Sequence, residues 1–202
     1  MYRNFVFDLG GVVVNYDPKG FLLNRFYSEG TEAKLYDAVF GSDEWKQLDK
    51  GTLTWREAAG IFMARAREMD LVFEMTAVLE EWTEMLSTRK ATITLLQLFK
   101  KKGFQLYYLS NMCSEVHSML QKRSFWPLFD GGILSYEVGM NKPDIDMYRA
   151  LLRKYALLPH ETIFTDDNKD NANAAFEAGI AGIHFKNLKD FCKMLVTYGV
   201  DV

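Results

Sequence analysis

Four short polar segments of the 202-residue chain carry side chains that could do chemistry together. They are FDLGGV with Asp8, YLSNM with Ser110 and Asn111, MNKPD with Lys142, and FTDDNKDN with Asp166 and Asp167. A carboxylate, a hydroxyl, an ammonium group and a second acidic cluster form a complete set for phosphoryl transfer, in which positioning and charge neutralisation supply most of the catalysis. Each segment alone also fits an ordinary turn, helix cap or solvated surface. The prediction therefore depends on their order and placement along the chain.

Short apolar runs that are typical of buried strands precede most of these polar residues. The runs cover residues 4–7, 105–109, 132–134, 162–165 and 182–185, and helical patterns cover 91–102, 114–122, 144–155, 171–178 and 188–198. This alternation predicts a mostly parallel sheet, because parallel neighbours need long crossover connections. We expect an α/β fold with a doubly wound, Rossmann-like sheet, in which the polar segments share one crevice at the carboxyl ends of the strands.

Residues 17–87 interrupt the alternation, since they are rich in Glu, Ala, Leu, Met and Phe at helical spacing. We predict an inserted helical domain over 17–87 and an α/β core formed by 1–16 and 88–202. Gly30, Gly41-Ser42 and Lys50-Gly51-Thr52 would divide the insertion into about four helices. Its candidate substrate contacts are Arg25, Trp45, Asp49 and Lys50, although charged residues of such a segment more often form a solvated face.

The segments FDLGGVVV, LSN, GMNKPD and DDNKDN resemble, in order, the four motifs of the haloacid dehalogenase-like hydrolases. They are most similar to those of the bacterial α-D-glucose-1-phosphate phosphatase type. The resemblance spans both ends of the predicted core. It implies a phosphatase whose helical insertion forms a cap over the site.

The resemblance also implies roles for individual residues. Asp8 would be the nucleophile and form an aspartyl-phosphate. Ser110 and Asn111 would donate hydrogen bonds to the phosphoryl group, and Lys142 would neutralise its charge and fix Asp8. The implied Mg²⁺ ligands are Asp8, the backbone carbonyl of Gly10, Asp167 with Asn171 as its polar partner, and Asp166 as a ligand or close neighbour.

Gly10 departs from the usual pattern of this family, in which a second Asp stands two residues after the nucleophile. That Asp protonates the leaving group, and general acid–base catalysis typically contributes about 10²- to 10⁴-fold. Leaving groups that depart as anions, such as those of anomeric sugar, aryl or acyl phosphates, would then be preferred. Asp17, Glu44 or Asp49 could replace the missing acid, and the glucose-1-phosphate type also lacks this Asp.

The sequence thus predicts a Mg²⁺-dependent phosphatase of small phosphorylated metabolites, with sugar phosphates such as glucose 1-phosphate as candidates. A phosphometabolite-binding domain without turnover is one alternative, and a metal-independent haloacid dehalogenase is another. The pair Asp166 and Asp167 favours a metal, because several carboxylates beside Asp8 would otherwise raise one another's pKa values.

The composition narrows the range of partners. A net charge of −3 and a pI near 5.7 offer no long-range attraction for nucleic acid, and the longest basic run is the triplet Lys100 to Lys102. No window approaches the roughly 20 apolar residues that a membrane span needs. The two cysteines, Cys113 and Cys192, are typical of reduced thiols, and we expect a cytoplasmic protein. The oligomeric state is left open.

Overall fold

The computed structural model describes residues 1–200 and contains one five-stranded parallel sheet in the order β3-β2-β1-β4-β5. β1 pairs with β2 on one side and with β4 on the other. The predicted doubly wound sheet is confirmed, and each strand lies within one residue of its predicted bounds. These bounds are β1 Asn4–Phe7, β2 Gln105–Ser110, β3 Gly131–Leu134, β4 Thr162–Asp166 and β5 Ala181–His184.

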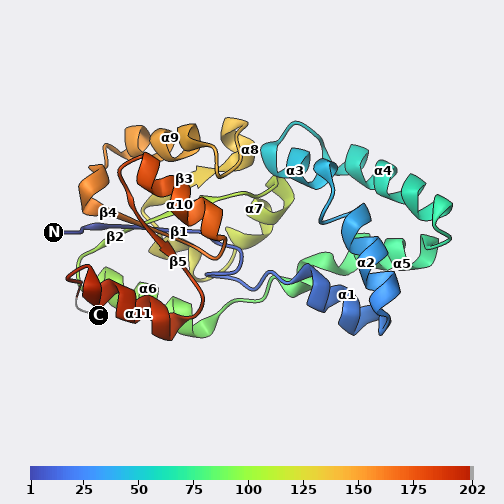
Figure 1. Ribbon diagram of the computed structural model, residues 1–202, viewed down its shortest axis with the longest axis horizontal. Coiled ribbons are helices and arrows are strands. Elements are labelled where there is room, and N and C mark those ends of the chain that lie inside the picture. The colour runs from blue at the N-terminus through green and yellow to red at the C-terminus, as the bar shows by residue number, and fades with distance from the viewer. Residues whose placement is uncertain (201–202) are drawn as a thin grey trace.

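Helices cover both faces of the sheet (Figure 1). α6 (Lys90–Lys101) and α11 (Leu188–Thr197) lie on one face, and α9 (Ile145–Tyr155) and α10 (Lys169–Glu177) lie on the other. The central strand alternates between them: the Phe5 ring lies 4.5 Å from the Phe99 ring of α6, whereas Val6 packs in the cluster that contains Tyr148 of α9. Because both faces are buried, β1 requires an uninterrupted apolar run.

The remaining elements of the α/β part are short. They are α7 (Ser114–Leu120), α8 (Ser135–Val138), and the 3₁₀ turns η2 (Trp126–Leu128) and η3 (Pro159–Glu161). α8 and both 3₁₀ turns were not predicted, because so few residues show no helical periodicity.

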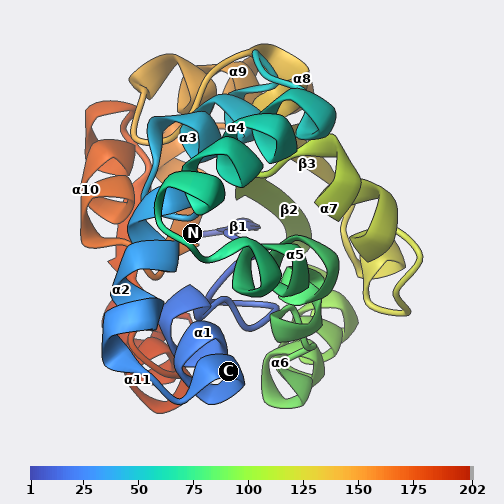
Figure 2. The same ribbon diagram turned by 90° about the vertical axis from the view of Figure 1, so that its right-hand side faces the viewer.

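Residues 17–87 form a helical group beyond the carboxyl ends of the strands, and Figure 2 views the molecule from this side. The prediction of about four helices is wrong by one. Gly30 lies within α2, and unexpected turns occur at Tyr27 (φ 52°) and Asp70 (φ 57°), where left-handed residues other than Gly give no sequence signal. The elements are α1 (Pro18–Phe26), α2 (Glu29–Ala38), α3 (Asp43–Lys50), α4 (Trp55–Glu68), α5 (Val72–Glu81) and the 3₁₀ turn η1 (Trp82–Met85).

The two chain segments that join the helical group to the α/β part run side by side. The backbone N–H of Asn15 donates to the carbonyl of Ser87 at 2.8 Å, and the N–H of Arg89 donates to the carbonyl of Val13 at 2.9 Å. The Arg89 guanidinium also donates to the Asn15 side chain at 2.8 Å. None of the helices within residues 1–200 combines the length and the hydrophobicity that crossing a bilayer requires.

Candidate active site

The carboxyl ends of three adjacent strands bring the predicted residues together. Asp8 directly follows β1, Ser110 is the last residue of β2, and Asp166 is the last residue of β4. Since β1 lies between β2 and β4, their carboxyl ends adjoin. The chain winds outward to β2 and β3 on one side and to β4 and β5 on the other, and such a switch point in an open α/β sheet is where ligands bind.

Lys142 reaches this point from the segment after α8 and joins two of the carboxylates. Its Nζ lies 2.9 Å from Asp8 Oδ1 and 2.6 Å from Asp166 Oδ2, and its side chain is only 1% exposed. Burial lowers the pKa of the ammonium group, but the two carboxylates outweigh it and raise the pKa above its ordinary value. Lys142 is therefore a fixed positive charge between Asp8 and Asp166.

Asp8 is a buried carboxylate that the surrounding chain holds in one orientation. The Ser110 hydroxyl donates to its Oδ1 at 2.6 Å, and the backbone N–H of Leu9 donates to the same oxygen at 2.8 Å. Burial raises the pKa of Asp8 to about 7; Lys142 opposes this rise, and the charges of Asp166 and Asp167 add to it. The hydrogen bonds and Lys142 thus favour an ionised Asp8, while burial and the acidic pair oppose it.

The two residues of the acidic pair have different surroundings. Asp166 accepts hydrogen bonds from the Asn168 N–H at 2.8 Å and from the Asn171 amide at 3.2 Å, in addition to Lys142. The expectation that Asn171 assists Asp167 is therefore wrong, because the start of α10 directs its amide to the last residue of β4. Partial burial and the charge of Asp166 raise the pKa of Asp167.

The arrangement fits a divalent cation. One oxygen each from Asp8, Asp166 and Asp167 lies within 4.8 Å of the others, and Mg²⁺ prefers such hard oxygen ligands. The Lys142 ammonium contacts two of these three carboxylates and offsets only part of their charge. Both oxygens of Asp166 accept hydrogen bonds, whereas the contacts of Asp8 all involve Oδ1, so Asp8 and Asp167 have more free coordination capacity.

The backbone of Lys142 holds the side chain of Asn111. Its amide donates to the Lys142 carbonyl at 3.0 Å and its Oδ1 accepts from the Lys142 N–H at 2.7 Å. The side-chain amide is thus engaged by the backbone of Lys142, and its bond to a phosphoryl group stays a prediction. Asn111 nevertheless lines the pocket and ties the segment of Lys142 to the end of β2.

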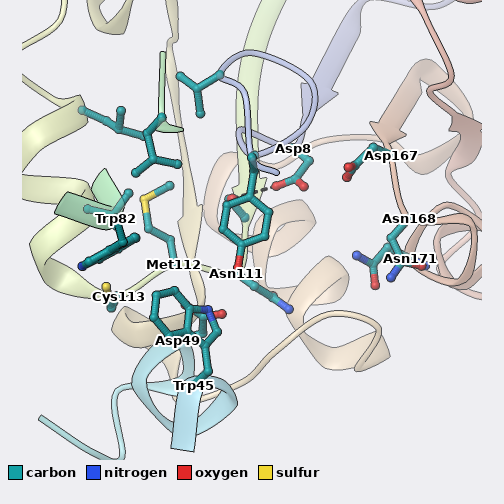
Figure 3. Close-up of a pocket in the computed structure, with 17 residues that line it drawn as sticks. Asp8, Trp45, Asp49, Trp82, Asn111, Met112, Cys113, Asp167, Asn168 and Asn171 are labelled. Atoms are coloured by element: carbon teal, nitrogen blue, oxygen red, sulfur yellow. Dashed lines mark hydrogen bonds between the residues drawn. The ribbon is translucent and has the colours of Figure 1, made fainter. Parts of the chain in front are cut away.

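A cavity of about 290 Å³ opens beside Asp8 (Figure 3). Gly10 and Asp167 line it from the α/β part, and Trp45 and Asp49 line it from α3. Arg25, another candidate contact, instead pairs with Glu81 at 2.7 Å, and Lys50 is not among the lining residues. Sequence reasoning assigned no role to several lining residues. Val14, Met112 and Asn168 lie within the quoted motifs, and no motif or spacing marks the others: Tyr16, Trp82, Leu86, Val116 and Leu120.

The structure separates the three candidates for the missing acid. Asp17 caps α1 by accepting from the Gly20 N–H at 3.0 Å, and Glu44 pairs with Arg65 at 2.7 Å. Asp49 lines the pocket with Asp8, and no hydrogen bond within residues 1–200 engages its carboxylate. Burial, together with the charge of Asp8, raises the pKa of Asp49 to about 7.

The fold and the site define an α/β enzyme of the type that carries an acidic centre at the switch point of a parallel sheet. Residues 2–179 match the family of haloacid dehalogenase-like hydrolases. The chain belongs to this family.

Named relatives and solved structures extend along almost the whole chain. The sesquiterpene phosphatase of Aspergillus oryzae is 27% identical over 198 residues, covering 96% of this chain and 95% of that protein. The D-ribitol-5-phosphate phosphatase of Bacteroides thetaiotaomicron is 27% identical over 206 residues, covering 95% of each. A haloacid dehalogenase-family enzyme of B. thetaiotaomicron superposes with a TM-score of 0.74 at 24% identity, covering 96% of this chain and 98% of that one. Its complex with magnesium and inorganic phosphate gives 0.71 at 23% identity, with coverage of 95% and 99%.

Proposed function

We propose that this protein is a Mg²⁺-dependent phosphatase of small phosphorylated metabolites that works through an aspartyl-phosphate on Asp8. Its family and the phosphatases among its relatives support a phosphoric monoester hydrolase. The observation that carries the proposal is the meeting of Asp8, Lys142 and the acidic pair beside a cavity that Asp8 and Asp167 line. A relative solved with magnesium and inorganic phosphate supports the choice of metal.

In the proposed reaction an oxygen of Asp8 attacks phosphorus while the bond from phosphorus to the leaving oxygen breaks. The Ser110 hydroxyl and Lys142 hold the carboxylate in place and stabilise its ionised form. Mg²⁺, held by Asp8 and Asp167 with Asp166 and the Gly10 carbonyl beside them, would neutralise charge on the phosphoryl oxygens. Water then cleaves the aspartyl-phosphate, releasing phosphate and regenerating Asp8.

We assign the proton transfers to Asp49. Its protonated carboxyl group would give a proton to the leaving oxygen, and its carboxylate would then take one from the attacking water. Its place in the same pocket as Asp8 supports this role, as does a carboxyl group that accepts no hydrogen bond from residues 1–200. Asp49 would therefore supply the acid that is missing at Gly10.

The proposal includes a division of the chain into a core of residues 1–16 and 88–202 and a cap of residues 17–87. Trp45 and Asp49 of α3 line the pocket, so movement of α3 would open and close the site. The adjacent linkers at Asn15 and Ser87 provide a narrow connection about which the cap could turn. A closed cap excludes water and positions the substrate.

The relatives point to substrates of different polarity. The motif resemblance favours a sugar phosphate such as glucose 1-phosphate, and one named relative acts on D-ribitol 5-phosphate. Another is a sesquiterpene phosphatase, whose substrates carry a hydrocarbon. The names alone do not select one class for this chain.

Acetyl phosphate provides the test of the chemistry, because its leaving group departs readily as an anion. We expect phosphate release with Mg²⁺, loss of release in EDTA, and at least a 10³-fold lower rate in Asp8→Asn. Mass spectrometry of the rapidly quenched protein should find a phosphoryl group on the peptide that contains Asp8. Binding without turnover would support the non-catalytic alternative, and release of halide from haloacids in EDTA would support the dehalogenase.

A further inference from the structure

The pocket beside Asp8 changes character from one end to the other. In Figure 3, Asp8 and Asp167 lie on one side of the cavity, and Trp82, Met112 and Cys113 lie on the opposite side. The first side holds acidic and amide groups that suit a phosphoryl group with its metal. Trp82 and Met112 belong to a larger apolar part of the lining: Val14, Trp82, Leu86, Met112, Val116 and Leu120.

Among the apolar side chains of this wall, only Trp82 carries a strong hydrogen-bond donor, its indole N–H. The Trp45 and Trp82 rings pack edge to face at 4.9 Å, which fixes the side of the wall that the insertion contributes. Burial raises the pKa of the Cys113 thiol to about 12, so the thiol stays neutral and behaves as a small apolar group. Leu120 is fully buried behind the surface.

A polyol in this part of the pocket would lose its hydrogen bonds to water and would gain few from the protein in return. Beyond the phosphoryl end, polar side-chain groups come from the Tyr16 phenol, the Asp49 carboxyl and the indoles of Trp45 and Trp82. These groups are fewer than the free hydroxyls of a hexitol phosphate, and unpaired hydroxyls that leave water weaken binding. A hydrocarbon group gains affinity from the same transfer.

The size of the cavity is consistent with such a group. Its volume of about 290 Å³ is roughly twice that of a cavity of about 150 Å³ that admits benzene. It can hold a phosphoryl group together with a hydrocarbon group of several carbons.

We infer that the substrate is the phosphate monoester of a largely apolar alcohol, with its hydrocarbon group against the wall formed by Leu86, Met112 and Val116. This inference rests on the proposed phosphatase function and names the substrate class of the same site.

Hexyl phosphate and sorbitol 6-phosphate provide a matched test, since both are primary phosphate esters of six-carbon alcohols. With Mg²⁺, we expect kcat/KM to be at least about 30-fold higher for hexyl phosphate. Along butyl, hexyl and octyl phosphate, kcat/KM should rise by up to about fourfold for each methylene that is buried. Acetyl phosphate, which lacks a long chain, reports the underlying chemistry in the same protein.

Two variants examine the wall itself. Val116→Thr replaces a methyl group by a hydroxyl with little change of shape at a side chain that is 7% exposed, and Val196→Thr makes the same change at 65% exposure on α11. We expect Val116→Thr to reduce the preference for hexyl over sorbitol phosphate at least fivefold, and Val196→Thr to leave it unchanged. Melting temperatures of both variants report whether they fold. The substrate series in the parent protein needs no variant.

Each outcome has a definite meaning. Equal or higher kcat/KM for sorbitol 6-phosphate, or no dependence on alkyl length, overturns the inference while acetyl phosphate turnover upholds the phosphatase. Absence of acetyl phosphate turnover contradicts the phosphatase function instead. If neither ester is turned over, inhibition of acetyl phosphate hydrolysis decides: stronger inhibition by hexylphosphonate than by sorbitol 6-phosphate supports the inference, and the reverse overturns it.

Discussion

At the scale of single residues, the site is governed by an excess of buried negative charge. Three carboxylates lie close together, one ammonium group contacts two of them, and burial strengthens their mutual effects. The pKa of Asp8 is raised to about 7, and the pKa of Asp167 is also raised. Such a centre is stabilised by protonation or by a bound cation.

The metal-free protein should therefore lose stability as pH rises. The pKa of Asp8 is about 7 in the folded protein against an ordinary value of 3.8, so the folded state binds this proton more tightly than the unfolded state. Its contribution is complete below about pH 4 and is lost as pH rises through 7. In EDTA at pH 8, Asp8→Asn should increase the free energy of unfolding, which urea titrations at pH 5 and pH 8 can measure. A less stable variant at pH 8 would contradict this account.

The role of Asp49 can be tested by the leaving group. Asp49→Asn should lower kcat about 10²- to 10⁴-fold for alkyl phosphates, whose alkoxide needs a proton, and much less for p-nitrophenyl phosphate. Asp43→Asn on the same helix changes an exposed Asp that pairs with Lys46, and it should leave both rates within about twofold. Equal losses on the two substrates in Asp49→Asn would assign Asp49 a structural role.

At the scale of elements, the loop after β1 and the segment after β4 fit closely against each other. Gly11 has a φ of +70°, and a Cβ there would lie 2.0 Å from Asp167 Oδ2. Glycine is therefore required at position 11 for two reasons: its backbone conformation and the close approach of the Asp167 carboxylate. The Asp167 carboxylate, a candidate metal ligand, therefore occupies space that a side chain at position 11 would fill.

Gly11→Ala should weaken Mg²⁺ binding at least tenfold, because the new methyl group displaces the Asp167 carboxylate. Gly139→Ala is a matched control: its φ of +67° is nearly the same, but a Cβ there meets nothing within 4 Å. Both variants should lose about 1–2 kcal/mol of stability from backbone strain, whereas calorimetric titration with Mg²⁺ should distinguish them. Equal affinities in the two variants would show that the carboxylate adapts to the methyl group.

At the scale of the whole molecule, one serine joins three parts of the chain. The Ser135 hydroxyl donates to the carbonyl of Asp49 and accepts from the backbone N–H of Met112 at 2.8 Å. A second link, from the Asn141 amide to the Lys46 carbonyl at 2.8 Å, also reaches α3. These bonds hold the proposed cap against the core at the helix that carries Asp49.

Ser135→Ala should cost about 1–3 kcal/mol of stability, since it leaves the Met112 N–H without this partner. It should also lower kcat/KM for alkyl phosphates, because the hydrogen bond that holds the Asp49 backbone in position is lost. Ser118→Ala, at an exposed position of α7, controls for the change of residue type. Urea unfolding and steady-state kinetics give the two readouts, and unchanged kinetics would remove Ser135 from the positioning of Asp49.

The sequence by itself determined the five strands, the main helices of the core and the convergence of Asp8, Ser110, Lys142 and the acidic pair. These features depend on local hydrophobic pattern and on the rule that parallel strands place their carboxyl ends together. The family resemblance added the expected roles. The turn at Asp70 escaped prediction, because a left-handed residue other than Gly has no sequence signal.

Only the tertiary structure decided which partner each polar side chain takes. The Asn171 amide donates to Asp166 rather than to Asp167, and the Asn111 amide donates to the Lys142 carbonyl. Of the three candidate acids, only Asp49 lines the pocket. The apolar wall is likewise assembled from both the insertion and the core. Partner choice and pocket chemistry depend on distances between residues far apart in the chain, and these distances are set only when the helical insertion packs against the α/β part.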